Sequence, residues 1–403
     1  MSKFAHIYKD AKGLQEELVT HRRYLHQHPE LGLDLPLTSA YVKEKLTEMG
    51  YKPLDCGQSG VLATVGGKNP GKVFLIRGDM DALPINEEVD WEFKSTNDNM
   101  HACGHDFHTS MLLGAAKLLK ENEDKIDGTI KLMFQPAEET LEGAKAMIEA
   151  GILENPRVDG AMMIHVISGQ AVASGKIVLP IGGVGNAASD WFELYIKGKG
   201  GHGASPNNTV DPLNIAAHTH IALQGINSRE IHSSHALALT VGVMEGGRVS
   251  NVIPDTAVLK GTIRTYDPEV REFVKTRVKE IAEATAKVFR GETDARIIEG
   301  CPSIVNDRGL VDAANKYLLE LLGEEAVMPI TDLYPSGRSS GSEDFGFLSE
   351  IVPTLSLSIG AGDSEEGYTY PIHHPKVRFD ESVLARGSAV YAYMALRWLE
   401  ENK

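Results

Sequence analysis

The stretch His101-Ala102-Cys103-Gly104-His105-Asp106-Phe107-His108 places three imidazoles, a thiol and a carboxylate close together in the chain. A helix over about 106–120 is indicated by the apolar residues that follow at once, namely Met111, Leu112, Leu113, Ala115, Ala116, Leu118 and Leu119. The polar cluster therefore lies in a loop and on the first turn of a packed helix. Thiolate and imidazole are the usual ligands of zinc and its transition-metal neighbours. An isolated Cys or His is more often structural, but a cluster this dense favours a metal site, provided that further ligands occur elsewhere.

Short apolar runs that predict β-strands occur at 61–65, 73–76, 130–134 and 161–164. The last three runs end in residues able to bind metal or move protons, which are Asp79 and Asp81, Glu138 and Glu139, and His165. Because sites in open α/β sheets lie beyond the carboxyl ends of the strands, we expect these side chains to meet. Helices predicted at about 106–120 and 142–150 separate the strands, as a βα alternation requires. The pattern predicts an α/β domain with a central mixed sheet.

The pattern of elements changes near residue 186. Strand, helix, strand, strand, helix and strand follow in that order at about 190–197, 215–226, 236–243, 255–264, 268–289 and 294–298. This order is the ferredoxin-like split βαβ pattern. We therefore predict two domains, in which an α+β ferredoxin-like domain at 187–297 is inserted into a metal-binding α/β domain formed by 1–186 and 298–403. A helix at 309–322, a strand at 354–359 and a helix at 382–399 complete the α/β domain.

Bulk composition excludes several classes of partner. The chain has 403 residues and a formal net charge of -16, which argues against nucleic acid or an anionic membrane as a partner. Its three cysteines, Cys56, Cys103 and Cys301, form no CxxC pair and no disulfide framework, so a reducing, cytoplasmic location is expected. No signal peptide is visible, and no apolar stretch is long enough to span a bilayer.

The candidate metal ligands are Cys103, His105, Glu139, His165 and one of the adjacent pair His373 and His374. A single metal needs about four donors, and this set is larger. A site for two metals with one shared donor is therefore the more economical prediction, with the ions roughly 3.5–4 Å apart. Cys103 is the natural shared donor, because a metal-bound thiol is deprotonated and carries charge.

Three acids near these ligands are expected to have different roles. Glu138 and Glu139 are adjacent and cannot both bind metal without strain, so one is expected to bind metal and the other to act on water. The alternative is a pair of solvated surface acids, which their position after a buried-type strand and Pro136 disfavours. Asp81 is better placed to orient a ligating histidine, although a role as a helix cap or turn acid stays open.

Three residues of the predicted insertion are weaker candidates. His202 lies in a glycine-rich loop at 198–206 that lacks the spacing of nucleotide-binding loops. A histidine on such a loop suits a group that closes over a substrate and polarises a carbonyl oxygen, but a loop histidine without a role is the competing interpretation. Asn251 is weaker still. Arg264 ends a strand and has the planar fork that binds a carboxylate, although surface arginines usually do nothing of the kind.

The chain resembles the metallopeptidase family of aminoacylases, hippurate hydrolases and plant hydrolases of indoleacetyl-amino-acid conjugates. The resemblance covers nearly the whole chain and rests on residues 21–23, 28–31, 77–84, 101–108, 135–139, 201–206, 250–254, 342–345 and 373–375. It implies a catalytic α/β domain that holds two metals and an inserted lid domain that commonly dimerises.

The resemblance also implies roles for individual residues. The positions that match the family's metal ligands are Cys103, His105, Glu139, His165 and His373. Glu138 matches the general base, Asp81 the acid that orients the metal site, and His202 a lid histidine that reaches the partner subunit's active site. Asn251 and Arg264 match lid positions linked to substrate binding. Asp79 stands where the wider superfamily often carries a metal-binding histidine, which places this chain in the cysteine-containing branch.

The predicted activity is metal-dependent hydrolysis of the amide bond of N-acyl amino acids with an acetyl, benzoyl or arylacetyl group. Glu138 would act as the general base, and two divalent ions per chain would be zinc, manganese, cobalt or nickel. The first alternative is a dipeptidase or carboxypeptidase that acts on ordinary peptides with the same chemistry. A metal-binding dimer without catalysis is a third hypothesis. A homodimer or higher homo-oligomer is expected from the resemblance, and the acyl group and amino acid stay open.

Overall fold

The computed structural model describes residues 2–403 and divides them into two compact units. The first unit contains the chain up to Gly185 together with Val305–Arg338 and Phe347–Lys403. The second contains Asn186–Ile304 and Ser339–Gly346. It therefore includes a loop after residue 338 that is remote in sequence from the range 187–297.

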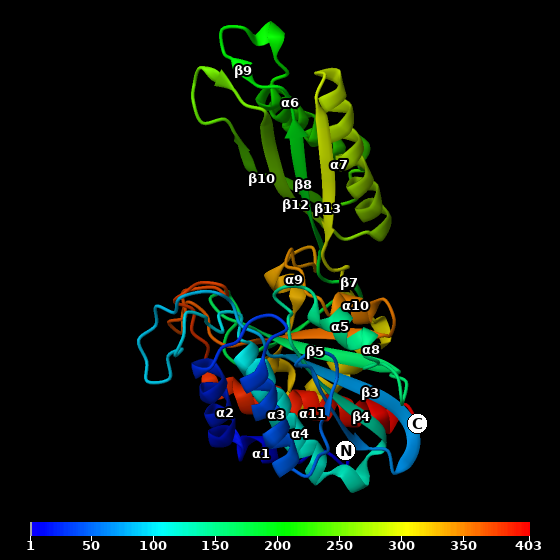
Figure 1. The fold of residues 1–403 in the computed structure, drawn as a ribbon. Helices are drawn as coiled ribbons and strands as arrows, with labels where there is room; N and C mark the ends of the chain where they lie inside the picture. Colours follow the sequence, from blue (N-terminus) through cyan, green and yellow to red (C-terminus); the bar gives the residue numbers. More distant parts are fainter. Residues whose placement is uncertain (1) are drawn as a thin grey trace. The chain divides into compact units, whose positions relative to one another are not determined.

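The first unit is built on a ten-stranded mixed sheet in which eight strands run in the order β1-β2-β4-β3-β5-β16-β14-β7 (Figure 1). Of the other two strands, β6 pairs with β16 and β15 pairs with β6. The pairs β3–β4, β3–β5 and β5–β16 are parallel, whereas β2–β4 is antiparallel. The strands are β1 (Leu54–Asp55), β2 (Val61–Gly66), β3 (Asn69–Asp79), β4 (Asp127–Gln135), β5 (Gly160–Ile167), β6 (Ile177–Leu179), β7 (Gly183–Val184), β14 (Val305–Asn306), β15 (Val327–Pro329) and β16 (Thr354–Gly360). The predicted central mixed sheet is confirmed.

The helices of this unit are α1 (Ile7–Lys12), α2 (Gln15–Gln27), α3 (Pro36–Glu48), α4 (His105–Glu121), α5 (Gly143–Glu149), α8 (Arg308–Leu322), α9 (Ile330–Leu333), α10 (Gly346–Ser349, which begins in the second unit) and α11 (Leu384–Glu401). Helices α4 and α11 lie side by side and both pack on β3 (Figure 1). The C-terminal half of β3 and most of β4 are buried, as expected for strands covered on both faces. The carboxyl ends of β3, β4 and β5 are thereby held in a rigid frame.

The second unit contains a four-stranded antiparallel sheet with two helices. Its elements are β8 (Ala188–Lys197), β9 (Gly201–His202), α6 (Pro212–Gly225), β10 (Leu237–Gly246), β11 (Val252–Ile253), β12 (Thr256–Thr265), α7 (Pro268–Val288) and β13 (Glu292–Glu299). The strand order β10-β12-β8-β13 is that of a ferredoxin-like fold, as the sequence predicts. Alternate residues of β8 and β12 are buried, and they form a core with residues of α6 and α7.

One strand begins earlier than the apolar run at 73–76 predicts, because positive φ angles between β2 and β3 are confined to Gly66 and Gly67 and β3 already begins at Asn69. Helix α1 was not predicted, because six residues carry too few apolar positions to show a period. None of the described helices combines the length and apolar character needed to cross a bilayer.

Candidate metal centre

The site forms where three parallel strands end beside the start of a helix. Asp79 ends β3 and lies opposite Gln135, the last residue of β4. His165 lies on β5, and His105 is the first residue of α4. Gly104, just before α4, has a φ of +86°, and a Cβ there would lie 2.3 Å from a methyl group of Val166. Only glycine fits this close approach, so the loop that carries Cys103 is held against β5.

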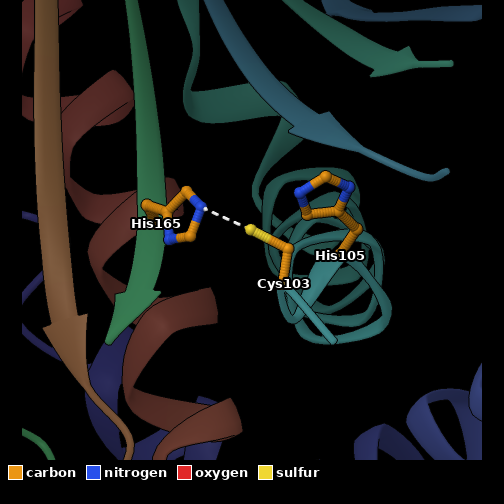
Figure 2. Close-up of side chains that lie close together, drawn as sticks. All are labelled: Cys103, His105 and His165. Atoms are coloured by element: carbon orange, nitrogen blue, oxygen red, sulfur yellow. Dashed lines mark hydrogen bonds between the residues drawn. The ribbon is translucent and has the colours of Figure 1, made fainter. Parts of the chain in front are cut away.

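Cys103 lies between two histidines that come from distant parts of the chain. Its Sγ is 3.4 Å from Nε2 of His165 and 3.3 Å from Nε2 of His373. Figure 2 shows the thiol directed at His165, with His105 on the other side of Cys103. Nδ1 of His165 donates to the carbonyl oxygen of Val166 at 2.7 Å, so its Nε2 carries a lone pair toward the thiol.

The structure separates the adjacent histidines 373 and 374. The backbone N–H of His373 donates to the carbonyl oxygen of Ala102 at 2.8 Å, and its φ of +66° turns the side chain toward Cys103. His374 stacks on Tyr370 with ring centroids 4.4 Å apart, and its Nδ1 accepts from the N–H of Lys376 at 3.0 Å. His373 is therefore the histidine that joins the cluster.

Asp81 holds the two glutamates and His105 in place. Its Oδ1 accepts from the N–H of Glu138 at 3.0 Å, and its Oδ2 accepts from the N–H of Glu139 at 3.1 Å. Nδ1 of His105 lies 3.3 Å from the same Oδ1. Nε2 of His105 then faces carboxylates, at 3.8 Å from Glu138 and 3.9 Å from Glu139. Both this Nε2 and Oε1 of Glu139 are buried without a hydrogen-bond partner.

The pKa values of the buried side chains show where protons and a cation would compete for the same ligand atoms. Burial would lower the pKa of His105, but the carboxylates of Asp79 and Asp81 raise it to about 10. Burial raises the pKa of Glu139 to about 7, although the charge of His105 opposes this shift. Burial lowers the pKa of His165 to about 3, which leaves that ring neutral. A cation would displace the protons on His105 and Glu139.

Two groups of three donors share Cys103. One consists of Cys103, His105 and His165, and the other of Cys103, Glu139 and His373, with the ligand atoms of each group within 4.8 Å of one another. Thiolate, imidazole and carboxylate suit zinc and its neighbours. The buried, unpartnered atoms Nε2 of His105 and Oε1 of Glu139 are suited to bind a cation, because buried polar atoms normally have a partner. The residues therefore fit a pair of metal ions.

Asp79 and His108 complete the surroundings of the cluster. Neither residue is assigned a definite role from the sequence. Oδ2 of Asp79 accepts from Nη1 of Arg77 at 2.9 Å, and the pKa of Asp79 is held well below its usual range by Arg77 despite burial. Nδ1 of His108 lies 2.5 Å from Oδ1 of Asp79. His108 follows His105 by three residues, so the helical spacing could have placed both on one face.

The second unit holds the remaining predicted residues at two separate places. Exposed His202 pairs with Val252 in the β9–β11 ribbon, and the N–H of Gly203 donates to the carbonyl oxygen of Asn251 at 2.8 Å. Arg264 lies near the far end of β12, roughly 26 Å along the strand from its start at Thr256, at about 3.3 Å per residue.

Arg264 is half-buried beside an aromatic ring. Its guanidinium carbon lies 5.7 Å from the ring centroid of Trp191, and its Nη1 is buried without a hydrogen-bond partner. Burial lowers the pKa of Arg264. An unpartnered N–H of this kind is suited to an anionic ligand, because an unmatched buried donor is costly.

Several named relatives are similar to nearly the whole of this chain. The chain is 38% identical over 396 residues to N-acetyl-L-cysteine deacetylase of Bacillus subtilis, covering 97% of this chain and 90% of that protein. It is 38% identical over 391 residues to IAA-amino acid hydrolase ILR1-like 2 of Arabidopsis thaliana, covering 96% and 86%. It is 35% identical over 396 residues to thermostable carboxypeptidase 2 of Saccharolobus solfataricus, covering 96% and 97%.

A solved structure is similar over nearly the whole chain. The YXEP protein of Bacillus subtilis, described as a dinuclear metal binding peptidase from the M20 family, superposes with a TM-score of 0.80. It is 32% identical, and the match covers 96% of this chain and 99% of that one. The model of peptidase family M20/M25/M40 matches residues 75–397. The predicted resemblance is confirmed, and the chain belongs to peptidase family M20/M25/M40.

Proposed function

We propose that this protein is an amidohydrolase that uses two divalent metal ions to cleave the amide bond of N-acyl amino acids. One observation carries the proposal. The carboxylate of Asp81 accepts hydrogen bonds from the backbone N–H groups of Glu138 and Glu139, and this pair lies beside the two donor groups that share Cys103. Relatives named as an N-acetylcysteine deacetylase and an IAA-amino acid hydrolase support the substrate class.

The metal ligands proposed are Cys103, His105 and His165 for one ion, and Cys103, Glu139 and His373 for the other. When bound, the ions supply Lewis acidity that activates water and polarises the scissile carbonyl. The similar solved structure from Bacillus subtilis is described as a dinuclear metal binding peptidase, which supports two ions per chain. Zinc, manganese, cobalt and nickel all suit these donors.

The other side chains have separate roles in proton transfer, positioning, oxyanion stabilisation and substrate binding. Glu138 takes a proton from the attacking water and returns it to the nitrogen of the leaving amino acid. Asp81 is a positioning residue, because it holds the backbone of Glu138 and Nδ1 of His105. His202 stabilises the oxyanion that develops on the carbonyl. Asn251 and Arg264 bind the substrate, and the unpartnered Nη1 of Arg264 suits the carboxylate of the amino acid.

The test is metal content per chain combined with hydrolysis of a substrate panel before and after chelation. The panel contains N-acetyl, N-benzoyl and indoleacetyl amino acids together with dipeptides. We expect about two ions per chain and chelator-sensitive hydrolysis of at least one N-acyl amino acid, as a two-metal site requires. Protein that binds no divalent ion, or that binds ions and hydrolyses nothing in the panel, would contradict the proposal.

A carboxypeptidase is the second candidate, favoured by the similarity to the Saccharolobus enzyme. The same two-metal chemistry cleaves a peptide bond when the acyl group belongs to another amino acid. Faster hydrolysis of dipeptides or longer peptides than of every N-acyl amino acid in the panel would select this candidate.

A further inference from the structure

Strands β3 and β5 separate just before the metal centre. Their parallel pairing runs from Phe74 opposite Gly160 to Arg77 opposite Met163 and then stops. Strand β5 continues to Ile167 and stays paired on its other side with β16. The edge of β5 that faced β3 therefore has no strand partner beyond Met163, although it lies in the buried interior. Backbone N–H groups left there must be satisfied in another way.

Two side chains satisfy these N–H groups. The hydroxyl of Tyr391 accepts from the N–H of Ile164 at 2.9 Å and donates to the carbonyl oxygen of Arg77 at 2.7 Å. Nε2 of His108 accepts from the N–H of Val166 at 2.9 Å. The gap between β3 and β5 is thus bridged first by a phenol and then, closer to the metal centre, by an imidazole.

The two hydrogen bonds of His108 define its protonation. Nε2 accepts a backbone proton, so it carries none of its own, and Nδ1 donates to Oδ1 of Asp79 at 2.5 Å. The ring is fully buried. His108, Asp79 and His105 bring potential metal-ligand atoms close together. Because both of its nitrogens are already engaged, His108 does not serve as a metal ligand.

One ring therefore links three elements that meet at the metal centre. His108 belongs to α4, which also carries His105, and it bonds to Val166, the neighbour of His165 on β5. Through Asp79 it reaches the end of β3, and Oδ2 of Asp79 lies 3.4 Å from Nε2 of His105. We propose that His108 is a positioning residue that sets the separation of His105 and His165 across this gap, and thereby the affinity of the metal centre proposed above.

The test compares two substitutions that each keep one of the two hydrogen bonds. In His108→Asn the amide sits at the position of Nδ1 and can still donate to Asp79, but it cannot reach Val166. In His108→Gln the longer amide can accept from Val166 and loses the donor position beside Asp79. The readouts are the number and affinity of bound cobalt(II) ions and the absorption of the cobalt–thiolate chromophore formed with Cys103. We expect both variants to fold and to bind cobalt roughly 10–100-fold more weakly, with an altered spectrum.

The matched control is Ser110→Ala, two residues further along the same helix. Its hydroxyl is buried and donates only to the carbonyl oxygen of Asp106, so the variant loses a buried hydrogen bond without touching the link between strands. Cobalt affinity and spectrum are expected to stay as in the wild type. If the His108 variants lose stability as the control does but keep wild-type cobalt affinity and spectrum, His108 is merely structural and the proposal is overturned.

A measurement on the wild-type protein keeps the proposal testable if the variants fail to fold. Nitrogen-15 NMR of labelled histidine should show His108 protonated at Nδ1 alone, and a proton on Nε2 would overturn the assignment. The inference about His108 rests on the proposed function only in assuming the metal centre. The cobalt-binding test can therefore be distinguished from a test of hydrolysis. Wild-type protein that binds cobalt but hydrolyses nothing would end the proposed activity while leaving the test of His108 readable. Wild-type protein that binds no cobalt would end both.

Discussion

At the scale of single residues, Glu138 and Glu139 are neighbours with different surroundings. Glu139 faces Cys103 and His373 in one donor group, whereas Glu138 belongs to neither of the two donor groups that share Cys103. We predict that Glu138→Gln lowers the rate of hydrolysis by about 10²–10⁴-fold with both ions retained, the usual contribution of a general base. Glu139→Gln should instead lose metal. Metal analysis and kcat on one N-acyl amino acid check both, and a Glu138→Gln variant with wild-type kcat would show that another group takes the proton.

Metal binding should depend on pH through the protons that the ligands release. In the metal-free chain, opposing charge raises the pKa of His105 to about 10, and burial raises that of Glu139 to about 7. A cation binds the deprotonated forms, so affinity should rise with pH and fall as the pH drops below 7, where Glu139 is mostly protonated. Each displaced proton contributes about tenfold per pH unit in the range where the group is protonated. Titration with cobalt between pH 6 and 8 in a pH-stat checks this, and pH-independent binding without proton release would contradict it.

At the scale of elements, helices α2 and α4 are joined by a buried ion pair. Nε of Arg22 lies 2.9 Å from Oδ2 of Asp106, which also lies 2.8 Å from Nδ1 of His26, and both charged side chains are fully buried. Burial alone would raise the pKa of Asp106, but Arg22 and His26 hold it well below its usual range. His26 therefore has a structural role.

Breaking this ion pair should lower the stability of the folded protein. Asp106→Asn removes the fully buried counter-charge of Arg22 and leaves it with the partly exposed Glu381, so the free energy of unfolding should fall by about 3–5 kcal/mol at neutral pH. Because the folded-state pKa of Asp106 is depressed, its contribution is fully present above its ordinary pKa and is lost only as the pH falls through the folded-state value. Urea unfolding at pH 7 and pH 5 should give the same difference between wild type and variant. A difference already reduced at pH 5 would mean that Asp106 is not held as an anion by Arg22.

The sequence predicts those elements whose pattern is local. Strands β4 and β5 and the C-terminal part of β3 appear as apolar runs, and the ligands at their ends could be named because parallel strands end at one edge. Two-residue strands such as β1 and β14 carry no pattern. The choice between residues 373 and 374 depends on a backbone angle, and the part played by His108 depends on where β3 and β5 separate. Both are tertiary properties that one sequence does not display.

At the scale of the whole molecule, metal should act as a stabilising ligand. Ions that bind only the folded chain add about 2.7 kcal/mol when present at 100 times their dissociation constant. Treatment with a chelator should therefore lower the melting temperature, and restoring zinc or manganese should raise it again. Thermal unfolding followed by circular dichroism checks this. An unchanged melting temperature in protein shown to bind two ions would mean that the unfolded chain binds them equally well.

The second unit offers an edge for self-association. Strand β10 is the outermost strand of its sheet, so one row of its backbone groups has no strand partner in the described chain. We predict a homodimer, with light scattering giving twice the mass of one chain. A monomeric wild type would contradict the dimer expected from the family resemblance.

The long segment of the second unit, Asn186–Ile304, begins and ends at neighbouring points. The N–H of Ser189 donates to the carbonyl oxygen of Cys301 at 3.0 Å, and Asp190 pairs with Glu299 across β8 and β13. Excising this segment therefore leaves two ends that a loop of a few residues can rejoin, without stretching the sheet that holds the candidate metal ligands. An insertion from a relative, grafted between the same two points, would exchange His202, Asn251 and Arg264 together. If these residues bind the substrate as proposed, substrate preference becomes a module separable from the chemistry of the metal centre.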